Sequence, residues 1–366
     1  MIVAAAAIGV AAAYAGWQEG KLPLLRAYLV AWLYWTGLSL GSLSLVLLHN
    51  MTGGAWGDAI RPTARAAAAT IVLMAIMSLP IMLNVELLYP WATNSGEANP
   101  LIEHKRPYLN VGFFHVRAAV YFGIWFALLA LLHWQEKRRG SDDPLLERKI
   151  SRLSGQGVLL HGLATTFAAI DWMMSLEPEW FSTIYGVLVF VSQGLAALAF
   201  AVLVFCMTGL GVTRKPVADV LHDLGKLLLG FVMLWAYMSF SQFLIIWYGN
   251  LPEEVIWYTR RLDAGWKWLA LALVAFHFAV PFVLLLSREW KRSAVRLGLV
   301  ACLLLVMNVA EKLWMVEPAI GSSTDFMPWL YTGLLLGVGA VWCAGFALNL
   351  PRMLVALDDE VGVQNG

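Results

Sequence analysis

The stretch AIDWMMSLEPEWFSTIYG, residues 169–186, joins two long apolar runs and places Asp171 near the end of the first. Each run is long enough to cross roughly 30 Å of hydrocarbon at about 1.5 Å per helical residue. Pro178 disfavours helical geometry at Glu177, so we expect Glu177-Pro178 to end the first run. The stretch therefore predicts two transmembrane helices joined by a short loop.

The composition extends this prediction to the whole chain. Of 366 residues, 60% are hydrophobic and 13% are charged, against about 25% charged residues in a soluble domain. The net charge of +1 argues against nucleic acid as a partner. The predicted fold class is an all-α polytopic membrane protein with about ten transmembrane helices, near residues 2–16, 27–49, 66–89, 111–133, 156–175, 183–211, 223–248, 266–286, 293–316 and 327–350.

The distribution of Lys and Arg between the loops predicts the orientation. Loops after even-numbered helices carry about fifteen of these residues, and loops after odd-numbered helices carry about six. Because loops rich in Lys and Arg stay in the cytoplasm, we expect both termini to be cytoplasmic. The odd-numbered loops are rich in Pro, Trp and Glu, and we interpret them as structured docking loops on the outer face.

A six-residue spacing occurs twice. Asp171 precedes Glu177-Pro178 by six residues, and Glu311 precedes Glu317-Pro318 by the same number, at an offset of 140 residues. This offset spans four helices, which preserves orientation and predicts two parallel-repeated four-helix bundles with two flanking helices. The expected units are residues 1–26 (first helix and loop), 27–182 and 183–322 (the bundles), and 323–366 (last helix and cytoplasmic tail).

Polar side chains within the predicted helices are the candidate functional residues. An ionisable group at the centre of a transmembrane helix costs at least about 2.5–3.5 kcal/mol, so such groups indicate function. Asp171 and Glu311 are interpreted as protonatable carboxylates inside the bundles; the alternative is an interfacial carboxylate satisfied by a loop or a cation. The other candidates are Lys312, His161, Thr165, Thr166, Ser241, Gln242, His277 and Asp223.

No metal or haem site is predicted. The three cysteines, Cys206, Cys302 and Cys343, lie singly in apolar runs and form no CxxC or CxxCH motif. His161 and His277 are expected at different depths, which does not suit haem b. We therefore expect this chain to bind no redox metal.

Three long blocks resemble a known family: TFAAIDWMMSLEPEWFSTIYGVLVFVSQ, LHDLGKLLLGFVMLWAYMSFSQFLIIWYGNLPEE and AFHFAVPFVLLLSREWKR. They are similar to the ActF subunits of bacterial alternative complex III, within the polysulfide-reductase membrane-anchor (NrfD-like) family, over about residues 27–316. The resemblance implies a bacterial cytoplasmic (inner) membrane protein with two four-helix bundles. It also implies a complex that oxidises quinol and passes electrons to a cytochrome c or to a terminal oxidase. Haem c and iron–sulfur clusters would lie in partner subunits, beside an ActC-like paralogue.

Three roles remain open within that resemblance. In the first, the chain contributes a proton pathway through the candidates above, with water filling the gaps. In the second, a quinone or quinol binds in the first bundle, where His115 or Asp171 would accept the hydroxyl proton and Arg117 would position the headgroup, with Glu86 nearby. Arg117 would pair with either Asp171 or Glu86. In the third, the chain is a structural membrane anchor. The chain supplies no electron acceptor, so we do not expect it to be catalytic alone.

Overall fold

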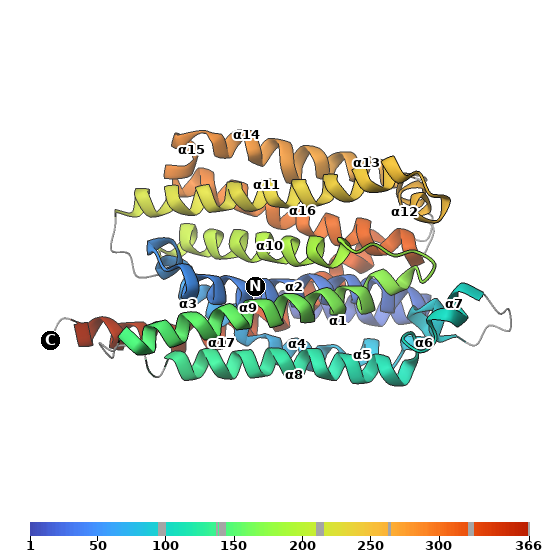
Figure 1. The fold of residues 1–366 in the computed structure, drawn as a ribbon, viewed down its shortest axis with the longest axis horizontal. Helices are drawn as coiled ribbons and strands as arrows, with labels where there is room; N and C mark the ends of the chain where they lie inside the picture. The colour runs from blue at the N-terminus through green and yellow to red at the C-terminus, as the bar shows by residue number, and fades with distance from the viewer. Residues whose placement is uncertain are drawn as a thin grey trace.

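The computed structural model describes residues 1–93, 100–136, 138, 144–209, 216–262, 265–320 and 326–364. Over these ranges all regular structure is helical, and ten helices are long and apolar enough to cross a membrane. The predicted fold class, an all-α polytopic membrane protein, is confirmed. The long helices run side by side along the long axis of the molecule (Figure 1).

Fourteen helical elements make up the ten candidate spans of the described residues. In chain order they are α1 (Ile2–Glu19), α2 (Lys21–Thr52), α3 (Ala55–Ala69) with α4 (Ile71–Met77) and α5 (Leu79–Met82), α8 (Val111–Glu136), α9 (Pro144–Trp172), α10 (Tyr185–Thr208), α11 (Val217–Gly249), α13 (Trp266–Ala272) with the π-helical η3 (Leu273–Ala279) and α14 (Val280–Leu286), α16 (Ala294–Ile320) and α17 (Pro328–Gln364).

Short helices lie between the spans. They are α6 (Val85–Leu88), η1 (Pro90–Ala92), α7 (Pro100–Lys105), η2 (Met174–Leu176), α12 (Pro252–Leu262) and α15 (Arg288–Arg292). Figure 1 shows α6, α7 and α12 at one end of the molecule, called here the α12 end. The start of α3, α15 and the C-terminus lie at the other, called the α15 end.

Several predicted boundaries are wrong. The fifth span was expected to begin at residue 156 but begins at Leu145. The third span was expected at 66–89 but covers Ala55–Met82, because Arg61 and Arg65 are buried against other helices instead of lying in a loop. The ninth helix was expected to end near 316, yet α16 continues through Glu317-Pro318 to Ile320. The first Glu-Pro pair behaves as predicted, since the backbone at Glu177 is no longer helical.

The spans pack in two neighbouring groups joined at α2 and α10. In the first group α2 packs on α3 and α9, and α9 packs on α8; in the second, α10 packs on α11 and α16, and α16 packs on η3. A Cβ at Gly41 of α2 would lie 2.0 Å from the carbonyl oxygen of Gln193 in α10, so only glycine permits this crossing. The internal repeat and the unit boundaries remain predictions, and the boundary at 322/323 lies outside the described residues.

The two flanking helices pack on each other through small residues. A Cβ at Gly9 of α1 would lie 2.2 Å from Cα of Gly337 in α17, and one at Gly333 would lie 2.3 Å from Cβ of Ala12. Small residues allow such close backbone approach between membrane helices. Helix α17 also packs on α2 and α3, which fixes the flanking pair to the first group.

Candidate functional site

Asp171, near the C-terminal end of α9, is buried and bound by two residues of α8. Arg117 donates from Nε to Oδ2 at 2.7 Å and from Nη2 to Oδ1 at 3.0 Å. The Tyr121 hydroxyl donates to Oδ2 at 2.7 Å. The i, i+4 spacing of Arg117 and Tyr121 places them on one face of α8. Of the two partners predicted for Arg117, the structure selects Asp171.

Aromatic rings enclose the other side of Arg117. Its Cζ lies 3.8 Å from the ring centroid of Tyr108 and 4.5 Å from that of Phe113, and Nη1 donates to the Tyr108 carbonyl at 2.7 Å. Burial, helped by the Asp171 charge, raises the pKa of Tyr108 to about 12, so this phenol is protonated at neutral pH. The Arg117–Asp171 ion pair is therefore enclosed by Tyr108, Phe113 and Tyr121.

Glu311 of α16 lies in a second buried cluster, formed with α10 and α11. Trp235 Nε1 donates to Oε1 at 2.7 Å, and Asn308 Nδ2 donates to Oε2 at 2.9 Å. The Ser192 hydroxyl also donates to Oε2. Lys312 Nζ lies 3.3 Å from Oε2 and 2.9 Å from Ser192 Oγ. The hydroxyl of Ser192 thus contacts both the ammonium and the carboxylate.

His277 lies at the edge of the Glu311 cluster, in the π-helical segment η3. Its ring centroid is 4.2 Å from that of Trp235, the indole that donates to Glu311. Pro281 lacks the N–H that would bond the His277 carbonyl four residues earlier, which explains why the helix widens there. The imidazole of His277 is fully buried.

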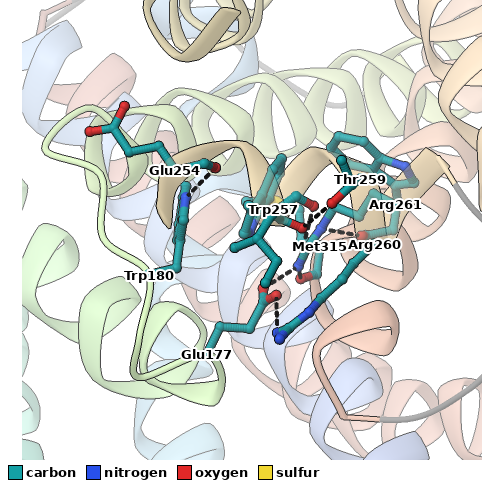
Figure 2. A network of polar contacts seen from close by, with 10 residues as sticks. Glu177, Trp180, Glu254, Trp257, Thr259, Arg260, Arg261 and Met315 are labelled. Carbon is teal, nitrogen blue, oxygen red and sulfur yellow. Dashed lines mark hydrogen bonds and ion pairs between the residues drawn. The ribbon is translucent and has the colours of Figure 1, made fainter. Parts of the chain in front are cut away.

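The first Glu-Pro motif is bound to the second group of helices at the α12 end. Figure 2 shows the Glu177 carboxylate facing two consecutive arginines of α12. Arg260 Nη1 lies 3.2 Å from Oε1, and Arg261 Nη2 lies 2.8 Å from Oε2. Arg261 is fully buried, with Cζ 3.8 Å from the ring centroid of Trp257. The Trp180 ring stacks on the Trp257 ring, with 5.0 Å between their centroids.

The same arginine stabilises the second Glu-Pro motif. Proline at 318 has no N–H for the Trp314 carbonyl four residues earlier, and its ring disturbs the helix turn. Arg261 Nε donates to the Trp314 carbonyl at 3.2 Å, and Nη2 donates to that of Met315 at 2.7 Å. Arg261 therefore supplies the hydrogen bond that Pro318 removes, which explains how α16 continues past it.

His161 and Thr165 lie in the first group, outside the Asp171 cluster. His161 Nε2 contacts Ser44 Oγ at 2.8 Å and the Leu40 carbonyl at 3.1 Å, and Thr165 Oγ1 lies 3.5 Å from Nδ1. The Trp125 ring lies 6.4 Å from that of His161 and 6.4 Å from that of Tyr121. An aromatic side chain thus stands where the predicted pathway would connect His161 to Asp171.

The remaining pathway candidates are dispersed. Thr166 packs closely against Gly186 of α10. Asp223 lies 3.2 Å from Lys226 near the start of α11. Ser241 is half-buried, and Gln242 is buried with its side chain next to that of Tyr258.

The four residues predicted for a quinone site, His115, Arg117, Asp171 and Glu86, do not come together in the structure. His115 is exposed, with its Nε2 2.9 Å from the Met82 carbonyl, and the Glu86 side chain is exposed. Only Arg117 and Asp171 of that set meet. We conclude that these four side chains do not surround one common binding site.

Four important side chains were missed in the sequence: Tyr121, Ser192, Trp235 and Arg261. A polar pair, Ser192-Gln193, inside an apolar run was a usable signal. Trp235 offered none, because the tryptophans were attributed to the interfacial belts.

Over the described residues, no group of three or more His, Cys, Asp or Glu side chains could hold a metal ion. The expected absence of haem and metal stays a prediction. Comparison with protein-family models and with curated proteins found no match to this chain.

Proposed function

We propose that the chain is an integral membrane subunit of a quinol-oxidising respiratory complex of the alternative complex III type, and that it contributes a transmembrane proton pathway. The observation that carries the proposal is the Glu311 cluster, where a carboxylate and an ammonium of α16 meet a hydroxyl of α10 within the membrane-spanning part of the protein. Ionisable groups at such positions mark ion or proton routes by default. The resemblance of the three long sequence blocks supplies the kind of complex.

Glu311 is better placed than Asp171 to exchange protons. The Asp171 carboxylate is held by two parallel bonds from one guanidinium, an arrangement that favours fixed geometry. Ser192 links Glu311 to Lys312 through one hydroxyl, and His277 lies next to the Trp235 indole. Rotation of the Ser192 hydroxyl and of the Lys312 ammonium can exchange hydrogen bonds with Glu311, which would allow a proton to move between these groups. In the first group of helices, Asp171 and His161 would carry the proton, and water would have to connect them past the Trp125 ring.

A quinone site in this chain is the weaker candidate. The Arg117 guanidinium is covered by Tyr108 and Phe113 and is bound to Asp171, which leaves Arg117 7% exposed. His115 and Glu86 face away into the exposed surface. In the proposed complex, quinol oxidation belongs to a partner subunit.

The complex itself is tested by purifying the tagged chain from its native membranes in mild detergent. We expect haem c, iron–sulfur clusters and quinol-oxidising activity to copurify with it in constant ratio. The same preparation carrying Glu311→Gln should keep its subunits and its quinol turnover. A chain that purifies alone, or a Glu311→Gln complex that falls apart, would contradict the proposal and favour another complex or a purely structural role.

A further inference from the structure

We propose that the surface formed by His222 and Lys226 of α11 with Arg288 and Lys291 of α15, called here the α11–α15 surface, binds the headgroup of one anionic phospholipid. Helix α15 packs on α11, and Figure 1 shows α15 and the start of α11 together at the α15 end of the molecule. None of these residues belongs to the carboxylate clusters, so the proposal does not depend on the proton pathway.

The fold brings the basic side chains of the α11–α15 surface together. Arg288 and Lys291 are three residues apart on α15, and His222 and Lys226 are four apart on α11, so each pair shares a face of its helix. The charges of Lys226, Lys291 and Arg288 all act on the His222 ring. A Cβ at Gly225 would lie 2.6 Å from Lys291 Cγ, so this glycine lets the lysine stem lie directly on α11. Two short segments of the chain therefore concentrate positive charge in one place.

The ammonium of Lys291 indicates that an anion binds at this surface. Lys291 is 7% exposed, and within the described residues its ammonium has neither an ion pair nor a hydrogen bond. A buried charge without a partner is costly, so we expect this ammonium to meet an anion from outside the chain. The neighbouring Arg288 is exposed and also has no carboxylate partner in the part of the chain that the structure describes.

Other cations near the α11–α15 surface already have carboxylate partners, so they do not need an external anion. These pairs are Lys226 with Asp223 at 3.2 Å, Arg292 with Asp219 at 2.7 Å and Arg296 with Glu289 at 3.4 Å. Arg288 and Lys291 are therefore the two side chains that would hold the ligand. A guanidinium beside an ammonium suits a phosphate group, whose oxygens accept from both.

The position of α15 favours a lipid over a soluble anion. Helix α15 begins two residues after α14 ends, and Val283 and Leu286 of α14 are 63% and 57% exposed, as expected of side chains that contact acyl chains. The basic side chains thus lie where a headgroup lies when its tails cover α14. The Lys and Arg distribution predicts that this end is cytoplasmic, and basic clusters next to a transmembrane helix on that side attract anionic lipid.

Lipid binding is measured by native mass spectrometry of the purified full-length chain. Delipidated protein is mixed with equal amounts of phosphatidylglycerol and phosphatidylcholine that carry the same acyl chains. We expect a preference of about 25-fold for phosphatidylglycerol, since each of two basic side chains at a headgroup contributes about fivefold. Equal binding of the two lipids, or displacement of phosphatidylglycerol by an equal amount of inorganic phosphate, would overturn the proposal.

Two substitutions test whether the preference arises at the α11–α15 surface. Arg288→Gln removes an exposed charge, and Lys291→Met removes the ammonium while keeping the apolar stem that packs on Gly225. Each should lower the preference for phosphatidylglycerol about fivefold, and the double variant should abolish it. If the variants with Lys291→Met do not fold, Arg288→Gln decides alone.

The matched control removes two positive charges elsewhere on the same predicted side of the membrane. Arg148→Gln with Lys149→Gln changes two exposed residues at the start of α9, and we expect it to keep the preference. A loss in this control as large as in the double variant would show that only the overall charge of the protein attracts the lipid. That result, or an Arg288→Gln protein with an unchanged preference, would contradict a site on the α11–α15 surface.

Discussion

At the scale of single residues, Asp171 and Glu311 occupy matching places in the sequence but have different partners. Asp171 meets one guanidinium through two bonds, whereas Glu311 is shared between an indole, an amide, a hydroxyl and an ammonium. Removing one partner of a buried ion pair costs about 3–5 kcal/mol, because the other charge is left buried and unpaired. Asp171 therefore has a structural contribution that any functional test must separate.

Asp171→Asn is expected to lower the free energy of unfolding by about 3–5 kcal/mol, because Arg117 keeps its charge without a carboxylate. The double variant Asp171→Asn with Arg117→Gln removes both charges and should recover part of this loss. Thermal unfolding of the purified protein in detergent measures both effects. An Asp171→Asn protein as stable as the unmodified one would show that the pair does not hold α8 to α9.

At the scale of helices, α16 depends on a residue far away in the sequence. Pro318 leaves the Trp314 carbonyl without its helical partner, and Arg261 of α12 supplies the missing donor while also binding Glu177. One buried side chain thus joins the end of the first group of helices to the second. Pro318 alone predicted a helix end, because the compensating donor could not be found from local spacing.

Arg261→Gln should cost about 3–5 kcal/mol, since Glu177 is buried and loses its closest cation. Adding Pro318→Ala restores an N–H for the Trp314 carbonyl, and we expect it to recover on the order of 1 kcal/mol. Arg260→Gln is the control: this neighbouring arginine contacts the same carboxylate at 3.2 Å, but its side chain is 42% exposed, so it should cost less than about 1 kcal/mol. Equal losses for Arg260→Gln and Arg261→Gln in thermal unfolding would refute the assignment.

At the scale of the whole molecule, the helices were predictable and the contacts between them were not. Long apolar windows predicted the ten spans. The start of the third span was missed because Arg61 and Arg65, which are buried in the structure, made that part of the sequence look like a loop. Asn308 lies three residues before Glu311 and Lys312 one residue after it, so spacing within one helix is enough to place both beside this carboxylate. Ser192 and Trp235 reach the same carboxylate from α10 and α11, and no local pattern relates them to α16.

The orientation is tested by labelling single cysteines with an impermeant probe, after Cys206, Cys302 and Cys343 are replaced by Ala. A cysteine at Ser141, a position outside the described residues, should react only from the cytoplasmic side. A cysteine at Glu253, exposed at the α12 end, should react only from outside. Labelling of the Ser141 variant from outside alone would reverse the predicted orientation.

The number of protons moved across the membrane per quinol oxidised tests the central claim most directly. The assembled complex is reconstituted into sealed vesicles, and Glu311→Gln, which keeps size and hydrogen bonding but removes the titratable proton, is compared with the exposed control Glu289→Gln. We predict that Glu311→Gln lowers the proton count while quinol turnover continues, and that Glu289→Gln changes neither. A Glu311→Gln complex with full turnover and an unchanged proton count would contradict a pathway through this carboxylate.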